Sequence, residues 1–218
     1  FSEAKTPRPA GRCCFFKQAR GSSVSKRIVI AEDEAVVRMG VRAILEAAGY
    51  RVAGEAANGE ECLELVRSCD PDLVILDVRM SPPDGIEVAR RLRETSPRPV
   101  VFLTAFSDRQ LLEAAAEAGA YGYVVKPVVG AELLAAVELA WARWRDLQEA
   151  REALQTRKLV ERAKGVLMRR LGLGEEEAYR LLQRRSRNLR RPMREVAQAV
   201  LVQEEIVSQS SKPKPKPR

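Results

Sequence analysis

The chain has 218 residues, of which 45% are hydrophobic and 31% charged, and it carries a net charge of +8. This composition predicts one or two folded domains, and no apolar stretch approaches the roughly 18 residues that would span a bilayer. The sequence contains no histidine, which excludes histidine-based acid–base catalysis and phosphoryl donation by a histidine of this chain. The four cysteines lack zinc-site spacing, so we expect free thiols, no membrane attachment and a cytoplasmic location.

The charge is unevenly distributed. Residues 25–144 contain 14 basic and 19 acidic residues, whereas residues 145–207 contain 15 basic and 10 acidic residues. An acidic region followed by a basic one predicts two domains, the second facing a polyanion. The two ends, residues 1–24 and residues 208–218, show no hydrophobic period and are rich in basic residues and proline. We expect a disordered N-terminal extension and a disordered basic tail.

The acidic region alternates short apolar runs with amphipathic segments. Strands are predicted at Arg27–Ala31, Arg51–Glu55, Leu73–Asp77, Val100–Thr104 and Tyr121–Val125. Helices are predicted at Glu34–Ala48, Gly59–Ser68, Gly85–Glu94 and Asp108–Ala118. Five such repeats predict an α/β domain over residues 25–145, with a doubly wound five-stranded parallel sheet. Its site is expected in the crevice at the carboxyl ends of the strands.

A long helix follows, over about residues 131–164, with no glycine or proline before Gly165. Leu147 and Leu154 have the spacing of a short coiled coil, and packing against the chain's own second domain is an equal alternative. The predicted domain over residues 146–207 is a small three-helix all-α unit, completed by helices near Gly174–Arg187 and Pro192–Val207.

Polar side chains follow the ends of four predicted strands: Glu32 and Asp33, Asp77, Thr104, and Lys126. Three clustered carboxylates repel one another unless a cation lies among them, and Mg²⁺ prefers such oxygen ligands. A carboxylate can also act as a nucleophile and form an aspartyl-phosphate, whose charge Mg²⁺ and a lysine would neutralise. Each residue alone has an ordinary alternative, such as a turn, a helix cap or a solvated lysine. Their coincidence at one sheet edge favours a phosphate-accepting site.

The motifs Glu32-Asp33, Asp77, Asp84-Gly85, Thr104-Ala105, Tyr123 and Lys126-Pro127 resemble the flavodoxin-like receiver domain of two-component response regulators. The resemblance covers residues 26–145 and implies that a histidine kinase phosphorylates Asp77. It also implies that Mg²⁺ is bound by Glu32, Asp33, Asp77 and the Arg79 backbone carbonyl. By the same resemblance Lys126 contacts the phosphate.

Further features follow from the same resemblance. Thr104 and Tyr123 form a switch pair, although an ordinary half-buried strand tyrosine is the alternative for Tyr123. The Lys126–Pro127 peptide is cis, and phosphorylation favours a homodimer. Ser81 departs from the family pattern, which usually has proline after the methionine, and this leaves the shape of that loop open.

Six arginines lie between residues 184 and 194, with no acidic residue among them: Arg184, Arg185, Arg187, Arg190, Arg191 and Arg194. We call this set the arginine block. A solvated surface is the ordinary interpretation of charged runs, but six arginines in a basic domain favour nucleic acid. Charge does not distinguish DNA from RNA.

The segments Leu159–Met168, Glu177–Leu182 and Arg194–Ala197 resemble the ANTAR domain, an RNA-binding antitermination module of some bacterial response regulators. The resemblance covers residues 148–207 and implies binding to paired hairpins in nascent transcripts. We expect RNA contacts from Lys164, Arg184, Arg187 and Arg191, and helix packing from the small residues Ala163, Gly165, Ala178 and Ala197.

The leading hypothesis is a phosphorylation-controlled, RNA-binding transcription antiterminator. A DNA-binding two-component transcription factor and a protein-interaction module with solubilising arginines are the alternatives. We expect no output enzyme, because residues 145–207 contain no set of side chains that supports turnover.

Overall fold

The computed structural model describes residues 25–105 and 117–210 of the chain. The chain divides into two compact units, Phe1–Arg145 and Asp146–Arg218. The predictions for residues 1–24 lie outside the described part, as do those for most of the helix Asp108–Ala118 and for most of the C-terminal tail. Among the described residues, no helix has the length and apolar character needed to cross a membrane.

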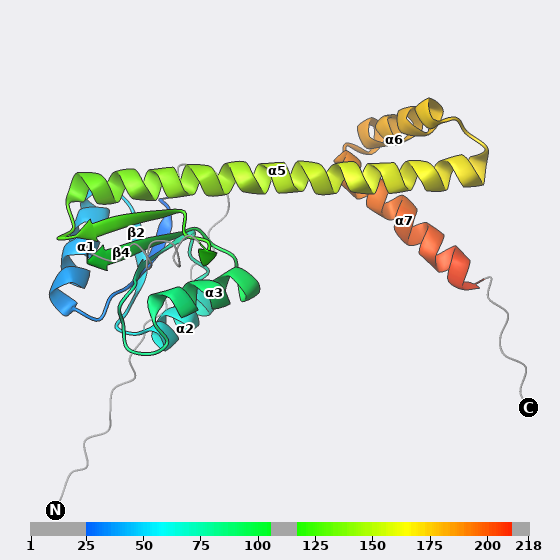
Figure 1. The fold of residues 1–218 in the computed structure, drawn as a ribbon. Helices are drawn as coiled ribbons and strands as arrows, with labels where there is room; N and C mark the ends of the chain where they lie inside the picture. Colours follow the sequence, from blue (N-terminus) through cyan, green and yellow to red (C-terminus); the bar gives the residue numbers. More distant parts are fainter. Residues whose placement is uncertain (1–24, 106–116, 211–218) are drawn as a thin grey trace, which may run out of the picture. The chain divides into compact units, whose positions relative to one another are not determined.

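The first unit contains the predicted parallel sheet of five strands (Figure 1). The strands are β1 (Arg27–Ala31), β2 (Arg51–Ala56), β3 (Leu73–Asp77), β4 (Val100–Ala105) and β5 (Gly122–Lys126). They lie in the order β2-β1-β3-β4-β5, and all neighbouring strands are parallel. This is the flavodoxin-like order, in which the chain reverses its direction of winding between β1 and β3. The predicted fold class is therefore confirmed, and the crevice at this switch point is where a site is expected.

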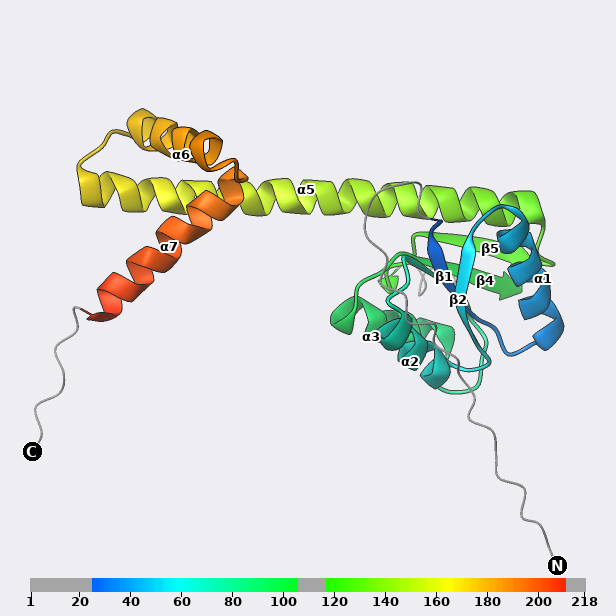
Figure 2. The ribbon, with the colours of Figure 1, turned by 180° about the vertical axis from the view of Figure 1, so that it is seen from behind.

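Helices cover both faces of this sheet (Figures 1 and 2). They are α1 (Ala35–Ala47), α2 (Gly59–Cys69), α3 (Gly85–Thr95) and the first part of α5 (Gly130–Leu171). One core lies between the sheet and α2 and α3, and the other lies between the sheet and α1 and α5. Successive β3 side chains alternate between the two cores, as side chains on a strand must. Every residue of β3 is consequently buried, which explains the continuous apolar run in its sequence.

Cys62 belongs to the core beneath α2. Its side chain has no exposed surface, and burial raises the pKa of its thiol to about 12. The thiol therefore stays protonated even in alkaline solution, because a thiolate would be poorly solvated there.

The second unit consists of the rest of α5 together with α6 (Glu175–Leu189) and α7 (Met193–Ser210). The prediction that the long helix ends at residue 164 is wrong, because α5 continues through Gly165 to Leu171. A helix tolerates an interior glycine at a cost of about 1 kcal/mol. Its actual end comes at Gly172, which has a φ of +65°, the left-handed conformation in which glycine commonly follows a helix.

A small apolar core joins the three helices of this unit. Its buried side chains are Val160, Ala163 and Val166 of α5, Leu182 of α6, and Val196, Ala197 and Leu201 of α7. The predicted packing residues Ala163, Ala178 and Ala197 are fully buried, and small side chains at these positions allow the helices to approach closely. Gly165 differs from them, because it remains partly exposed.

Candidate functional site

The register of the strands brings the predicted polar residues to one edge of the sheet. Ala31 of β1 pairs with Leu76 of β3, so the next residues, Glu32 and Asp77, stand level. Asp77 pairs with the β4 residue that precedes Thr104, and Lys126 is the last residue of the neighbouring β5. The site therefore sits at the carboxyl ends of β1, β3, β4 and β5, in the crevice expected for this topology.

Three carboxylates meet at this edge. One carboxylate oxygen from each of Glu32, Asp33 and Asp77 lies within 4.8 Å of the other two. Glu32 is fully buried and Asp77 is 3% exposed, whereas Asp33 faces solvent. Such a cluster is unfavourable without a compensating charge, and its all-oxygen donor set suits a hard divalent cation. Asp33 is thus the member of the cluster that is exposed to solvent.

Lys126 supplies a positive charge to the same cluster. Its Nζ lies 2.8 Å from Glu32 Oε2 and 3.0 Å from Asp77 Oδ2, and it donates a hydrogen bond to Glu32 Oε1. Glu32 Oε2 is buried and receives no hydrogen bond with good geometry. It therefore retains a lone pair that can coordinate a metal cation. The residues present thus fit a magnesium ion.

The protonation of this pair follows from its burial. Desolvation raises the pKa of Glu32, and the nearby charge of Asp77 raises it further, against the hydrogen bond from Lys126. Burial lowers the pKa of Lys126, but the hydrogen bonds and charges of Glu32 and Asp77 outweigh it and raise the pKa overall. Lys126 is therefore a cation at neutral pH, able to attract the oxygens of an incoming phosphoryl group.

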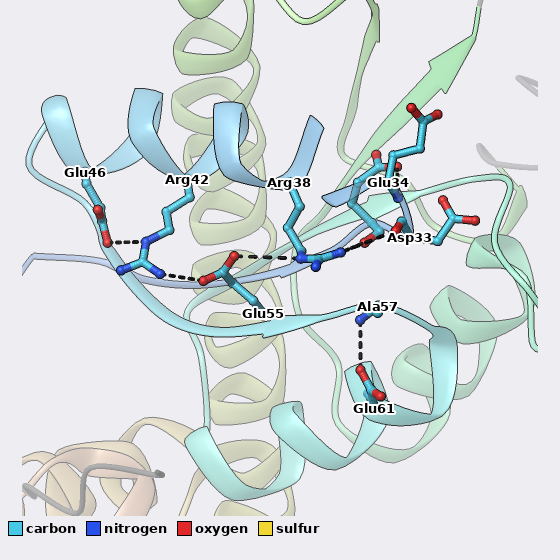
Figure 3. A network of polar contacts seen from close by, with 9 residues as sticks. Asp33, Glu34, Arg38, Arg42, Glu46, Glu55, Ala57 and Glu61 are labelled. Carbon is cyan, nitrogen blue, oxygen red and sulfur yellow. Dashed lines mark hydrogen bonds and ion pairs between the residues drawn. The ribbon is translucent and has the colours of Figure 1, made fainter. Parts of the chain in front are cut away.

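Arg38 of α1 holds the backbone that carries the acidic pair (Figure 3). Its Nη1 donates a hydrogen bond to the Glu32 carbonyl at 2.5 Å and lies 3.5 Å from the Asp33 carbonyl. Its Nε also lies 3.8 Å from a carboxylate oxygen of Glu55 on β2. One guanidinium thus ties α1, β2 and the loop after β1 together. Arg38 was not among the predicted site residues, because its only signal in the sequence is an arginine five residues after Asp33.

The first residue of α3, Gly85, has no room for a side chain. The Gly85 amide donates to the Val78 carbonyl at 3.1 Å, and a Cβ on Gly85 would lie 2.0 Å from the Asp77 carbonyl oxygen. Asp84 caps α3 by accepting a hydrogen bond from the Glu87 amide. The start of α3 therefore packs directly against the backbone of Asp77.

The other predicted site residues lie around this cluster. Thr104 is 8% exposed at the end of β4, and its hydroxyl donates to the Ala105 carbonyl at 3.4 Å. Tyr123 of β5 is 56% exposed, and its part in a switch pair stays a prediction beside the alternative of an ordinary half-buried strand tyrosine. Arg79 follows Asp77 by two residues, in the loop that leads to α3. The Lys126–Pro127 peptide is cis, as predicted, and so is Pro82–Pro83 in the loop that contains Ser81.

The four residues predicted to contact RNA fall into two environments in the second unit. Lys164 is buried, and its Nζ lies 2.9 Å from Glu161 and 2.7 Å from Glu175, the first residue of α6. Arg184, Arg187 and Arg191 are exposed, and Arg191 pairs with Glu195 at 3.2 Å. The lysine joins α5 to the start of α6, whereas the three arginines are available to a ligand.

Comparison with known proteins agrees with both halves of this arrangement. Residues 28–138 match the family described as response regulator receiver domain, and residues 148–201 match the ANTAR domain. The transcriptional regulatory protein PdtaR of Mycobacterium tuberculosis is 43% identical over 187 residues, which cover 83% of this chain and 91% of PdtaR. The transcriptional regulatory protein AfsQ1 of Streptomyces coelicolor is 40% identical over 116 residues, covering 53% of this chain and 51% of AfsQ1.

Solved structures resemble the first unit. A putative response regulator from Chloroflexus aurantiacus matches with a TM-score of 0.52 and 34% identity, over 55% of this chain and 99% of that structure. The signal receiver domain of the putative response regulator NarL from Mycobacterium tuberculosis matches with a TM-score of 0.52 and 32% identity, over 54% and 97%. The chain therefore belongs to the response regulators in which a receiver domain is followed by an ANTAR domain.

Proposed function

We propose that the protein is a response regulator that is phosphorylated on Asp77 by a histidine kinase and then binds RNA hairpins as a transcription antiterminator. The carrying observation is the cluster of Glu32, Asp33, Asp77 and Lys126, in a chain that continues into a helical domain with exposed arginines. We place this activity in the cytoplasm, where nascent transcripts are found, and propose a homodimer as the phosphorylated form.

The chain's own groups account for the phosphoryl transfer. A carboxylate oxygen of Asp77 attacks the phosphorus of a phosphohistidine, the new O–P bond forms as the N–P bond breaks, and the electron pair stays with the imidazole of the kinase. Lys126, already 3.0 Å from Asp77, pairs with the oxygens of the transferred group. A bound Mg²⁺, held by Glu32, Asp33, Asp77 and the Arg79 carbonyl, would neutralise part of the phosphoryl charge. Thr104 then donates its hydroxyl to the phosphate, and Tyr123 takes up the space that Thr104 leaves.

The output is tested by comparing nucleic acids. Hairpin RNA is expected to compete with a fluorescent hairpin at fixed salt at least ten times more strongly than duplex DNA of the same length. Duplex DNA that competes equally well or better would favour a DNA-binding transcription factor. Absence of salt-dependent binding to either nucleic acid would point instead to an output that binds protein.

Replacement of Arg187 by glutamine is expected to weaken binding of all hairpins similarly, because a phosphate contact carries no sequence information. The plot of log affinity against log salt should become shallower by about one unit. Arg180→Gln is the matched control, since Arg180 is an exposed arginine on the same helix that pairs with Glu176 and lies outside the arginine block. An equal change of slope in both variants would contradict a specific role for the arginine block.

Replacement of Arg38 by alanine is expected to weaken Mg²⁺ binding about 10-fold, because the Glu32–Asp33 backbone loses its hydrogen bonds to α1. Isothermal titration with MgCl₂ measures the affinity. Arg42→Ala is the control, because Arg42 also pairs with Glu55, at 2.6 Å, and figures in the same network (Figure 3). Equal Mg²⁺ affinity of the two variants would show that Arg38 does not position the acidic pair.

A further inference from the structure

Gly165 lies in the interior of α5 without a packing reason for being glycine. A Cβ built on it would meet only the flexible end of Arg169, at 3.7 Å. The residues next to this position, Lys164 and Val166, are buried, whereas Gly165 is partly exposed. An interior glycine destabilises a helix relative to alanine. The fold of the second unit would therefore be more stable with alanine at position 165. Because glycine is present despite this cost, we take it to be needed for binding a ligand.

A hollow of about 350 Å³ lies beside Gly165, between α5 and α7. The two helices touch through the apolar core and then diverge towards the end of α7 (Figures 1 and 2). The hollow is lined by Gly165, Val166 and Leu201 together with the charged residues Glu161, Arg162, Arg169, Glu204 and Glu205. Any side chain at position 165 would project into or beside this space.

The lining suits one flat, partly polar group. Val166 and Leu201 offer apolar surface, and the planar guanidinium groups of Arg162 and Arg169 can stack on an aromatic ring. Carboxylate oxygens can accept hydrogen bonds from amino groups on the edge of a base, even while they are paired with a cation. The three carboxylates disfavour a phosphate, and the volume is at the small end of ligand pockets, too small for a protein helix.

We propose that this hollow receives an unpaired base of the RNA hairpin, and that Gly165 is glycine because a side chain would occupy the base's place. The proposal rests on the proposed function and deepens it by distinguishing two kinds of RNA contact, one with phosphates and one with a base. Arg194 of the arginine block lies 3.5 Å from Gln155 of α5, and Gly165 is ten residues further along, about 15 Å at 1.5 Å per residue. One hairpin can span that distance, with its stem phosphates at the arginine block and its loop at the hollow.

The probe for the test is the tightest-binding hairpin selected against the full chain from a library with a fixed stem and a randomised loop. Gly165→Ala and Gly165→Leu are compared with Gly40→Ala, since Gly40 is also an interior helix glycine, on α1, with nothing within 4 Å of its Cβ position. Both alanine variants are expected to unfold a few degrees higher than the wild type. Only the Gly165 variants should lose RNA affinity, at least 3-fold for alanine and at least 10-fold for leucine.

A double-mutant cycle then tests the base itself. Each loop nucleotide of the hairpin is replaced in turn by an abasic one, and affinity is measured with wild type and with Gly165→Leu. One position should cost the wild type about 10-fold and cost Gly165→Leu almost nothing, because the base no longer enters the hollow. Equal RNA binding by the wild type and the Gly165 variants, or losses that add at every loop position, would overturn the base site while leaving the proposed function intact. Failure of the wild type to select any hairpin would overturn both.

Discussion

Asp77→Asn is expected to abolish phosphorylation of the protein and, with it, any increase of RNA affinity on treatment with a small-molecule phosphoryl donor. The amide that replaces the carboxylate is not a nucleophile, so no acyl phosphate forms. The two side chains have the same shape, and Asp77 is buried beside Lys126, so the fold should persist. Phosphoprotein is measured by phosphate-affinity electrophoresis, and RNA affinity by fluorescence anisotropy with and without donor and Mg²⁺.

Asp84→Asn is the matched control for this experiment. Asp84 lies in the loop that follows Asp77, but its carboxylate caps α3, a role that asparagine fills equally well. This variant should be phosphorylated like the wild type. If Asp77→Asn still incorporates phosphate, the acceptor is a different residue. If phosphorylated and unphosphorylated wild type bind the same hairpin equally, phosphorylation does not control the output.

Gly85→Ala is expected to have the largest effect on stability, a loss of about 3 kcal/mol in the free energy of unfolding of the receiver. Its added methyl group would lie 2.0 Å from the Asp77 carbonyl oxygen and 3.0 Å from the Val78 Cα. Both contacts are with backbone, so relief requires a shift of β3's end or of the start of α3. Phosphorylation should fall as well, because that shift displaces Asp77 from Glu32 and Lys126.

Gly40→Ala again supplies the comparison, because its Cβ enters open space within a helix. That substitution should stabilise the receiver by about 0.5–1 kcal/mol. Urea unfolding followed by far-ultraviolet circular dichroism measures both free energies. A Gly85→Ala protein as stable as the wild type would mean that the contact between α3 and the Asp77 backbone is looser than the structure indicates.

Strand order and register explain why the receiver site was predictable from the sequence. The apolar run of β3 marks a strand buried on both faces, and the carboxyl ends of neighbouring parallel strands necessarily meet. Glu32 directly follows such a strand, and Asp77 and Lys126 are the last residues of theirs, so locating the strands also located the side chains. Strand ends that differ from expectation by one residue, as in β5, did not disturb this result, because Lys126 remains at the same edge.

The contacts of Arg38 and Lys164 could not be predicted from the sequence. Arg38 acts on backbone carbonyl groups, which every residue has, so nothing in the sequence of the loop identifies it. Lys164 was predicted to contact RNA because it is basic and lies in the ANTAR-like segment Leu159–Met168. The packing of α6 instead places its ammonium between Glu161 and Glu175, and such long-range pairing depends on the angle between two helices. RNA contact by Lys164 stays a prediction, and Glu161 and Glu175 compete with RNA for its ammonium group.

The C-terminal end of α5 was also difficult to predict from the sequence. Gly165 looks like a helix end when only local propensity is considered, yet Ala163 and Val166 on either side of it are buried against α6 and α7. Tertiary packing compensates for the weak helix former and carries the helix on to Gly172. Gly165, which made the end of the helix hard to predict, is also the residue with open space at its Cβ position that lines the proposed base site.

Cys62 of α2 has a buried, protonated thiol. This residue can therefore serve as an intrinsic reporter of the opening of the receiver. Alkylating reagents and peroxides attack thiolates, and a pKa of about 12 leaves almost none in the native state. Modification of Cys62 therefore has to wait until the receiver opens, so its labelling rate measures how often that happens. Kinase, Mg²⁺ and phosphate can then be ranked by how strongly each suppresses these openings, without adding any dye or tag to the chain.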